Sequence, residues 1–295
     1  MNSLQRFLLI FGALLVPLSL SSQEDLMSLL DEGPQTEYAY GTFKTTRVVL
    51  NHSVQAPAPG EMVFIISHHF GRINEGAYNF WGLDAATIRL GLEYSLNDFV
   101  SFGIGRGTWK KMFDGHLKLK LLRQSSGKRV MPVTVSYFSS LGINSLHWQY
   151  PERENYFTSR LSYVHQLLIA RKFNETLSLQ LSPTLVHRNL VVANDDQNDV
   201  FAMGLGGRVK LTRRTTLNVD YFYLLPGKTA DNFNNSLSVG FDIETGGHVF
   251  QLFFTNSNPI TEHGFITETT GRWDKGDIFF GFNITRTFTL VKPKL

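Results

Sequence analysis

Residues 86–95 read ATIRLGLEYS, and every second side chain in this stretch is apolar. A strict period of two is typical of a β-strand with one apolar and one polar face, because successive side chains of a strand point to opposite sides. The stretch therefore predicts a strand. Its apolar set is Ala86, Ile88, Leu90, Leu92 and Tyr94, and its polar or small set is Thr87, Arg89, Gly91, Glu93 and Ser95.

The same alternation recurs from Glu61 onward and predicts twelve strands. Most of them have about 9–11 residues or slightly more, the length that a tilted strand needs to cross a bilayer. Alternation alone would also suit a soluble β-sandwich or a lipocalin-like barrel. The expected strands cover residues 61–70, 84–95, 98–107, 112–123, 129–142, 157–173, 175–188, 199–212, 214–224, 234–244, 247–256 and 276–290.

The connections between these strands alternate between long and short. Long connections at 143–156, 189–198 and 257–275 follow or precede tight turns such as 173–174 and 245–246. Long loops on one side and tight turns on the other are typical of outer-membrane barrels. An even number of strands then places both ends of the barrel on the side of the tight turns, which faces the periplasm.

Tryptophan placement points the same way. Trp81, Trp109, Trp148 and Trp273 all lie in or beside long connections, where an interfacial belt of aromatic residues is expected. A soluble barrel would turn its apolar face inward and would need no such bias. The sequence therefore predicts an all-β, up-and-down antiparallel transmembrane barrel of about twelve strands.

Composition excludes several other classes of protein. Of the 295 residues only 18% are charged, whereas about a quarter is usual for a soluble domain. The net charge is +3 and there is no basic run, so a nucleic-acid partner is not expected. The chain contains no cysteine, which excludes disulfides and thiolate sites.

The first 22 residues have the pattern of a cleaved signal peptide. Arg6 precedes an apolar run at 7–20, and small residues follow it. The run is too short for a spanning helix. We expect residues 1–22 to be the signal peptide, 23–60 a periplasmic N-terminal segment that acts as a plug or a leader, and 61–295 a barrel in the outer membrane of a Gram-negative bacterium.

Several longer stretches resemble a known family. They are GTFKTTRVVLNHSVQ at 41–55, ISHHFG at 66–71, GLDAATIRLGLEYSLND at 82–98, IGRGTWKKMFDGHLKLKLLRQ at 104–124 and FSSLGIN at 138–144. Together they resemble the membrane-bound β-barrel family of the Bacteroidota known as domain of unknown function 5777. The resemblance implies an outer-membrane barrel and implies no activity.

The alternation along each strand also predicts which charged side chains face the lumen, because residues two apart share a face; we call this rule parity. The set is mixed and slightly cationic, which suits either a water-filled path or a closed interior held by ion pairs. The positive residues are Arg89, Lys118, Lys120, Arg160, Arg188, Arg208 and Lys210, and the negative ones are Glu93, Asp114, Asp220, Asp242 and Glu244.

The histidines suggest chemistry at first sight. His68 and His69 are neighbours in a strand, so their rings point to opposite faces and cannot hold one ion together. Asp114 and His116 lie two apart on a polar face, which suits an acid/base pair or half of a metal site as well as a charged lumen wall. His165 falls in the lipid-facing set, and a bulge, a protein neighbour or a misassigned strand would each explain it.

No catalytic residue, metal ligand or cofactor is expected. The chain has no GxSxG motif, so a serine hydrolase has no positive support. GIGRG at 103–107 falls within a strand with no helix after it, and its inward glycines, like Gly204 and Gly206, leave room for water or for another segment.

Two functions fit these observations. The first is a channel for passive or gated passage of small polar solutes, with Arg89, Lys118, Lys120, Arg208 and Lys210 setting a weak anion preference. The second is a closed barrel that serves as a membrane anchor or docks a periplasmic or surface protein, through an external loop at 257–275 or through residues 24–58. Strand-like residues 43–55 either fold into the periplasmic mouth or form an extended leader.

Overall fold

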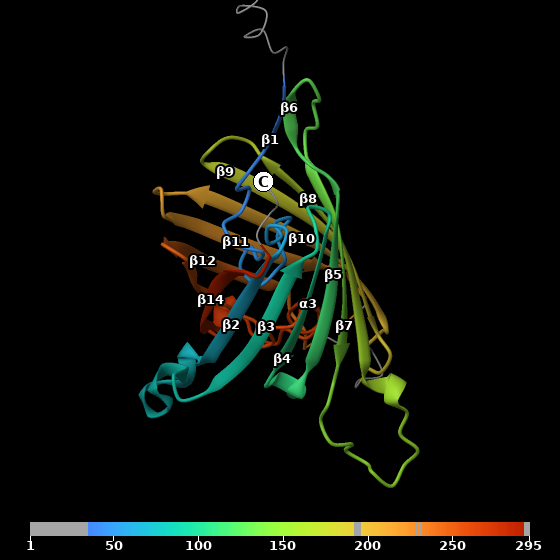
Figure 1. Ribbon diagram of the computed structural model, residues 1–295. Helices are drawn as coiled ribbons and strands as arrows, with labels where there is room; N and C mark the ends of the chain where they lie inside the picture. The colour runs from blue at the N-terminus through green and yellow to red at the C-terminus, as the bar shows by residue number, and fades with distance from the viewer. Residues whose placement is uncertain (1–34, 192–195, 228, 230–231, 292–295) are drawn as a thin grey trace, which may run out of the picture. The chain divides into compact units, whose positions relative to one another are not determined.

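Twelve antiparallel strands form one closed barrel in the computed structural model, which describes residues 35–191, 196–227, 229 and 232–291 (Figure 1). The expected signal peptide lies outside these residues. Each strand pairs with its neighbours in sequence, and β14 pairs with β2 to close the ring, so the predicted up-and-down barrel is confirmed. The strands are β2 (Glu61–Arg72), β3 (Ala86–Ser95), β4 (Val100–Gly107), β5 (Phe113–Leu122), β7 (Thr134–Ile143), β8 (Leu161–Lys172), β9 (Leu177–Arg188), β10 (Asp199–Lys210), β11 (Thr215–Leu224), β12 (Ser236–Thr245), β13 (His248–Thr255) and β14 (Phe279–Thr289).

Two strands begin at least four residues later than the sequence predicts. β7 begins at Thr134 rather than near 129, because the chain first forms β6 (Ser125–Gly127), which pairs with β1 (Thr36–Tyr38) in a separate two-stranded sheet. β8 begins at Leu161 rather than 157, because the preceding residues form a 3₁₀ turn, η4 (Phe157–Arg160). The other 3₁₀ turns of the described residues lie in the long connections and are η1 (Ile73–Glu75), η2 (Ala77–Gly82), η3 (Trp109–Lys111) and η5 (Trp273–Lys275).

The two faces of the barrel wall differ as the alternation predicts. In β3, Leu90 and Leu92 are 49% and 38% exposed, whereas Arg89 and Glu93 are each 3% exposed. Apolar side chains outside and polar side chains inside are the reverse of a soluble protein and suit a barrel surrounded by lipid. None of the helices in the described part of the chain is long and apolar enough to cross a bilayer.

Residues 39–58, here called the plug segment, run inside the barrel (Figure 1). Residues 42–54 are buried except for the half-buried Lys44. Although its sequence alternates like that of a strand, the segment forms only an isolated bridge, between Arg47 and His52. Instead the segment turns back on itself: the N–H of Val48 donates to the carbonyl of Asn51. The segment adds no strand to the barrel because side chains of the wall, rather than a neighbouring backbone, bind its peptide groups.

The connection between β13 and β14 also folds into the barrel, so the expectation of an external loop at 257–275 is wrong. Residues 259–267 are buried, and they include the helix α3 (Glu262–Thr267). Phe265 and Ile266 are 0% exposed and belong to the same buried apolar cluster as Val49 of the plug segment. We call residues 256–271 the in-folded loop. Its apolar side chains draw it inside, because the plug segment offers them an apolar surface.

Candidate functional site

One carboxylate of the barrel wall binds the tip of the plug segment. Oδ2 of Asp220 on β11 accepts hydrogen bonds from the backbone N–H groups of Val49, Leu50 and Asn51, at 3.1, 2.8 and 3.0 Å. Three successive N–H groups that converge on one oxygen form a nest for an anion. Asp220 is 1% exposed, so these hydrogen bonds lie away from bulk water and each contributes about 1.5–3 kcal/mol.

Amide side chains of the wall bind more of the plug backbone. Oε1 of Gln180 on β9 accepts a hydrogen bond from the N–H of Val54 at 3.0 Å, and its Nε2 donates to the carbonyl of His52 at 2.7 Å. The wall side chains thereby supply the backbone hydrogen bonds that a paired strand would otherwise supply. Further hydrogen bonds of this kind run from Gln251 Nε2 to the Val48 carbonyl (3.2 Å) and from Asn283 Nδ2 to the Val49 carbonyl (3.3 Å). In the opposite direction, Nδ2 of Asn51 in the plug segment donates to Oγ of Ser182 in the wall at 3.1 Å.

Two wall cations that the sequence places in the lumen are bound to the plug segment. Nζ of Lys118 donates to the carbonyls of Ser53 and Gln55, at 2.9 and 2.7 Å. NH1 of Arg208 donates to the carbonyl of Thr42 at 2.9 Å. In this conformation neither cation is free to select a solute.

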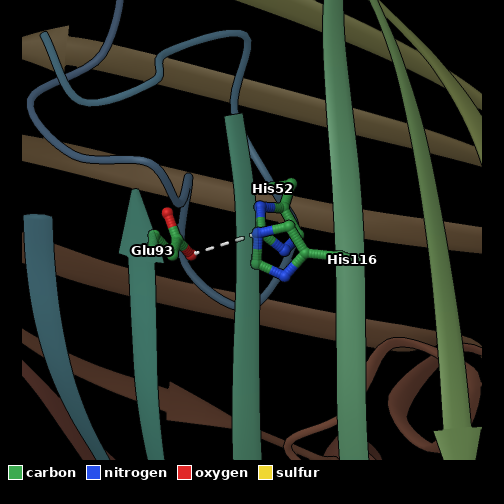
Figure 2. A group of neighbouring side chains, drawn as sticks. All are labelled: His52, Glu93 and His116. Carbon is green, nitrogen blue, oxygen red and sulfur yellow. Dashed lines mark ion pairs between the residues drawn. The ribbon is translucent and has the colours of Figure 1, made fainter. Parts of the chain in front are cut away.

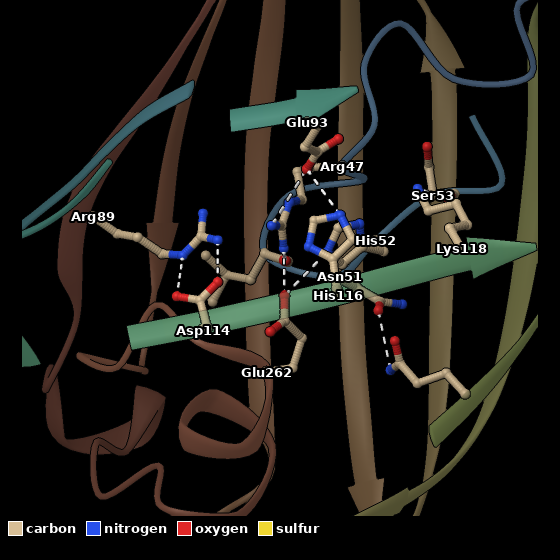
Figure 3. A network of polar contacts seen from close by, with 12 residues as sticks. Arg47, Asn51, His52, Ser53, Arg89, Glu93, Asp114, His116, Lys118 and Glu262 are labelled. Atoms are coloured by element: carbon tan, nitrogen blue, oxygen red, sulfur yellow. Dashed lines mark hydrogen bonds and ion pairs between the residues drawn. The ribbon is translucent and has the colours of Figure 1, made fainter. Parts of the chain in front are cut away.

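The plug segment meets the wall and the in-folded loop at a buried ionic junction (Figure 3). NH1 of Arg47 donates to Oε1 of Glu262 on α3 at 2.7 Å, and its NH2 lies 3.7 Å from Oε1 of Glu93 on β3. Nε2 of His52 lies 3.1 Å from the same Glu262 oxygen. One arginine thus links all three parts of the barrel interior, and its removal would leave two buried carboxylates with only histidines as ion-pair partners.

Other predicted lumen residues pair within the wall or at its ends. Arg89 makes a bidentate ion pair with Asp114, in which Nε of Arg89 donates to Oδ1 of Asp114 at 2.9 Å. Arg160 lies in η4, outside the strands, where it donates to the Asn144 carbonyl and covers the ring of Trp148. Of the rest, Asp242 accepts from Gln251 (2.8 Å), Arg188 donates to the Gln197 carbonyl (2.8 Å), Glu244 pairs with Lys44, and Lys120 and Lys210 are half-buried.

The inward glycines make room for different neighbours. A Cβ at Gly103 would lie 2.3 Å from the ring of His116, so this glycine makes room for a wall side chain. A Cβ at Gly206 would lie 3.3 Å from Cγ2 of Val48, so this glycine makes room for the plug segment. The sequence predicts the space but not its occupants.

Gly206→Leu is therefore expected to displace the plug segment. Overpacking costs about 1–3 kcal/mol, so we expect roughly tenfold faster trypsin cleavage after Arg47, which is buried in the closed barrel. Gly207→Leu is the matched control, because a Cβ there faces Leu179 on the lipid side at 3.5 Å. Equal cleavage rates in the two variants would contradict the placement of the segment against β10.

The four tryptophans do not share one environment. Trp81 is 54% exposed, as a residue of an interfacial belt would be. Trp109 instead contacts α3, where its ring centroid lies 5.5 Å from that of His263. Nε1 of Trp273 donates to the carbonyl of Leu237 at 3.1 Å. Loop packing thus accounts for the positions of Trp109 and Trp273.

His68 and His69 face opposite sides of β2, as their parity predicts. His69 is 0% exposed, and its Nδ1 lies 3.0 Å from the carbonyl oxygen of Asn258 in the in-folded loop. His68 stacks on Phe282 of β14, with ring centroids 5.0 Å apart. The pair belongs to the architecture of the wall.

His165 lies in a regular part of β8, and the neighbouring strand supplies its partners. Its Nδ1 lies 2.7 Å from the hydroxyl of Tyr137 and 3.1 Å from Oγ of Ser139, both on β7. No bulge or misassigned strand is needed to explain it. Because both hydroxyls share one ring nitrogen, the contact is that of a satisfied histidine rather than of a base that serves one nucleophile.

Comparison with known proteins supports the barrel. The profile of a family described as "membrane bound beta barrel domain" matches residues 43–288. No curated protein matches the sequence significantly. Among solved structures, the chain is similar to the NanC porin, with 7% identity and a TM-score of 0.47 over 78% of this chain and 100% of that chain. It is also similar to an outer-membrane channel from Pseudomonas putida F1, with 13% identity and a TM-score of 0.47 over 79% of this chain and 97% of that chain. A third similar structure is outer membrane phospholipase A from Escherichia coli, with 11% identity and a TM-score of 0.42 over 84% of this chain and 100% of that chain. Such distant likeness says nothing of a shared activity.

Proposed function

Because the chain belongs to the family of membrane-bound β-barrel domains and lies in the outer membrane of a Gram-negative bacterium, we propose that it is a gated channel for small polar solutes. The observation that carries the proposal is the polar inner wall. Side-chain oxygens of Ser136 and Ser236 have no hydrogen-bond partner among the described residues, so water or a solute can complete their hydrogen bonds. A wall of this kind suits a path that fills with water once the plug segment moves.

Passage is gated rather than passive in this proposal. The plug segment buries five apolar side chains, each of which stabilises the closed state by about 1.5–3 kcal/mol. Their sum far exceeds thermal energy, so spontaneous opening is rare and a trigger is needed. A periplasmic protein that pulls on the N-terminal part of the chain would provide one. The five residues are Phe43, Val48, Val49, Leu50 and Val54.

The same burial also suits the second candidate, a barrel that stays closed and serves as an anchor or docking partner without transport. The depth at which the plug segment is buried favours it. Neither candidate involves chemistry on a substrate. The two differ in one measurable property, which is whether the plug segment leaves the lumen while the barrel remains folded.

A reversible disulfide tests this difference. The natural chain has no cysteine, and a Cβ at Gly206 would lie 3.3 Å from Cγ2 of Val48, so the pair Val48→Cys and Gly206→Cys would lie within reach of a unique disulfide bond. In planar bilayers with moderate urea on the periplasmic side, we expect steady openings from the reduced double variant and silence from the oxidised one. The two single variants are controls. Silence of the reduced form, with a folded barrel, would support the closed anchor instead.

A further inference from the structure

Three potential metal ligands converge inside the barrel from separate parts of the chain (Figure 2). His52 belongs to the plug segment, Glu93 to β3 and His116 to β5. One ligand atom from each lies within 4.8 Å of the other two. The three residues are 0%, 3% and 9% exposed, so the cluster lies away from bulk water.

Two atoms of this cluster, Nδ1 of His52 and Oε1 of Glu93, have no hydrogen-bond partner among the residues that the structure describes. Nε2 of His52 already pairs with the Glu262 carboxylate at 3.1 Å, so Nδ1 is the ring nitrogen without a partner. Buried polar atoms without partners are costly, so a species that binds to them at this point is favoured.

We propose that His52, His116 and Glu93 bind a divalent transition-metal ion of the zinc type, which joins the plug segment to the barrel wall. Two imidazoles and one carboxylate are ligands that zinc prefers, with bonds of about 2.0–2.2 Å and ligand atoms about 3.3 Å apart. The present separations require side-chain shifts of about 1 Å. This differs from the expectation that the chain holds no metal. An ion bound here would also hold the plug segment in the lumen and oppose opening. That consequence rests on the proposed function, whereas metal binding itself does not.

Two nearby cations determine which carboxylate is available. Arg47 holds Glu262 with a 2.7 Å hydrogen bond but approaches Glu93 only to 3.7 Å. Lys118 is occupied by carbonyl groups of the plug segment. An ion that takes Glu93 therefore breaks none of these hydrogen bonds, and the Glu93 carboxylate offsets part of its charge.

Calorimetric titration of ZnCl₂ into the mature protein, purified without a histidine tag and stripped of metal, tests the site. We expect one Zn²⁺ per chain. His52→Ala, His116→Ala and Glu93→Gln should each weaken binding about tenfold or more, since even residues that only support metal ligands matter by about 10–100-fold. His187→Ala is the matched control, because His187 is an exposed histidine paired with Asp199, and its loss should leave the affinity unchanged.

Cobalt(II) gives an independent readout of the same ligand set. A tetrahedral Co²⁺ complex with His ligands has visible d–d bands, which should be strong in the unaltered protein and lost in Glu93→Gln, an isosteric change that folds even where a histidine variant does not. The proposal is overturned by the absence of Zn²⁺ binding to the folded protein. It is equally overturned if all three ligand variants bind Zn²⁺ as tightly as the unaltered protein does, or if only His187→Ala binds it more weakly.

Discussion

Deletion of residues 41–56 is expected to turn a barrel that rarely conducts into one that conducts steadily. The deletion removes the five buried apolar side chains that hold the lumen closed and frees Lys118 and Arg208 from their carbonyl partners. A loss of more than about 3 kcal/mol from the closed state raises the open fraction by roughly a hundredfold or more. Single-channel recording in planar bilayers measures this fraction directly.

The deletion needs a control that shortens the chain without touching the lumen. Removal of residues 150–155 does so, because they are part of the exposed connection between β7 and β8. This variant should remain as quiet as the full chain. If the plug deletion is folded and also silent, the in-folded loop closes the barrel on its own and the plug segment is not the gate.

The barrel wall could be predicted from the sequence because lipid makes the pattern unambiguous. Outward side chains are mostly apolar and inward ones can be polar, so the faces of Leu90 and Arg89 can be assigned without knowledge of any partner. The same parity correctly separated His68 from His69. Strand ends were less certain at β7 and β8, where local turns rather than the membrane decide where pairing begins.

The interior could not be predicted in the same way, because its contacts join distant parts of the chain. The tip of the plug segment depends on Asp220, about 170 residues further along. Its sequence alternates like a strand, but hydrogen bonds within the segment and to side chains of the wall hold it in a tight bend. Parity placed Asp220 in the lumen, but nothing in a single sequence shows that three N–H groups surround it.

The position of the in-folded loop is the feature that the sequence predicted least well. Length alone suggested an external loop, as is usual for the long connections of such barrels. A signal was present, since Ile260, Phe265 and Ile266 are apolar residues in a largely polar connection. Glu262, which meets Arg47 and His52 at the ionic junction, could not be assigned to the site without first placing the loop inside.

Asp220→Ala is expected to release the tip of the plug segment while the barrel stays folded. The substitution leaves three buried backbone N–H groups without their acceptor, and each such group costs about 1–3 kcal/mol. The closed state thus loses about 3 kcal/mol or more, which favours opening roughly a hundredfold. Conductance should rise accordingly, and trypsin should cleave after Arg47.

Two further variants separate the causes of this effect. Asp277→Ala removes a carboxylate that binds Arg72 and Asn74 in a connection, and should change neither conductance nor cleavage. Asp220→Asn keeps an oxygen that accepts hydrogen bonds but removes the charge, so it should fall between the wild type and Asp220→Ala. If Asp220→Ala itself keeps the plug segment protected and the lumen silent, the amide contacts of Gln180 and Asn283 suffice to hold it, and the nest is not its main anchor.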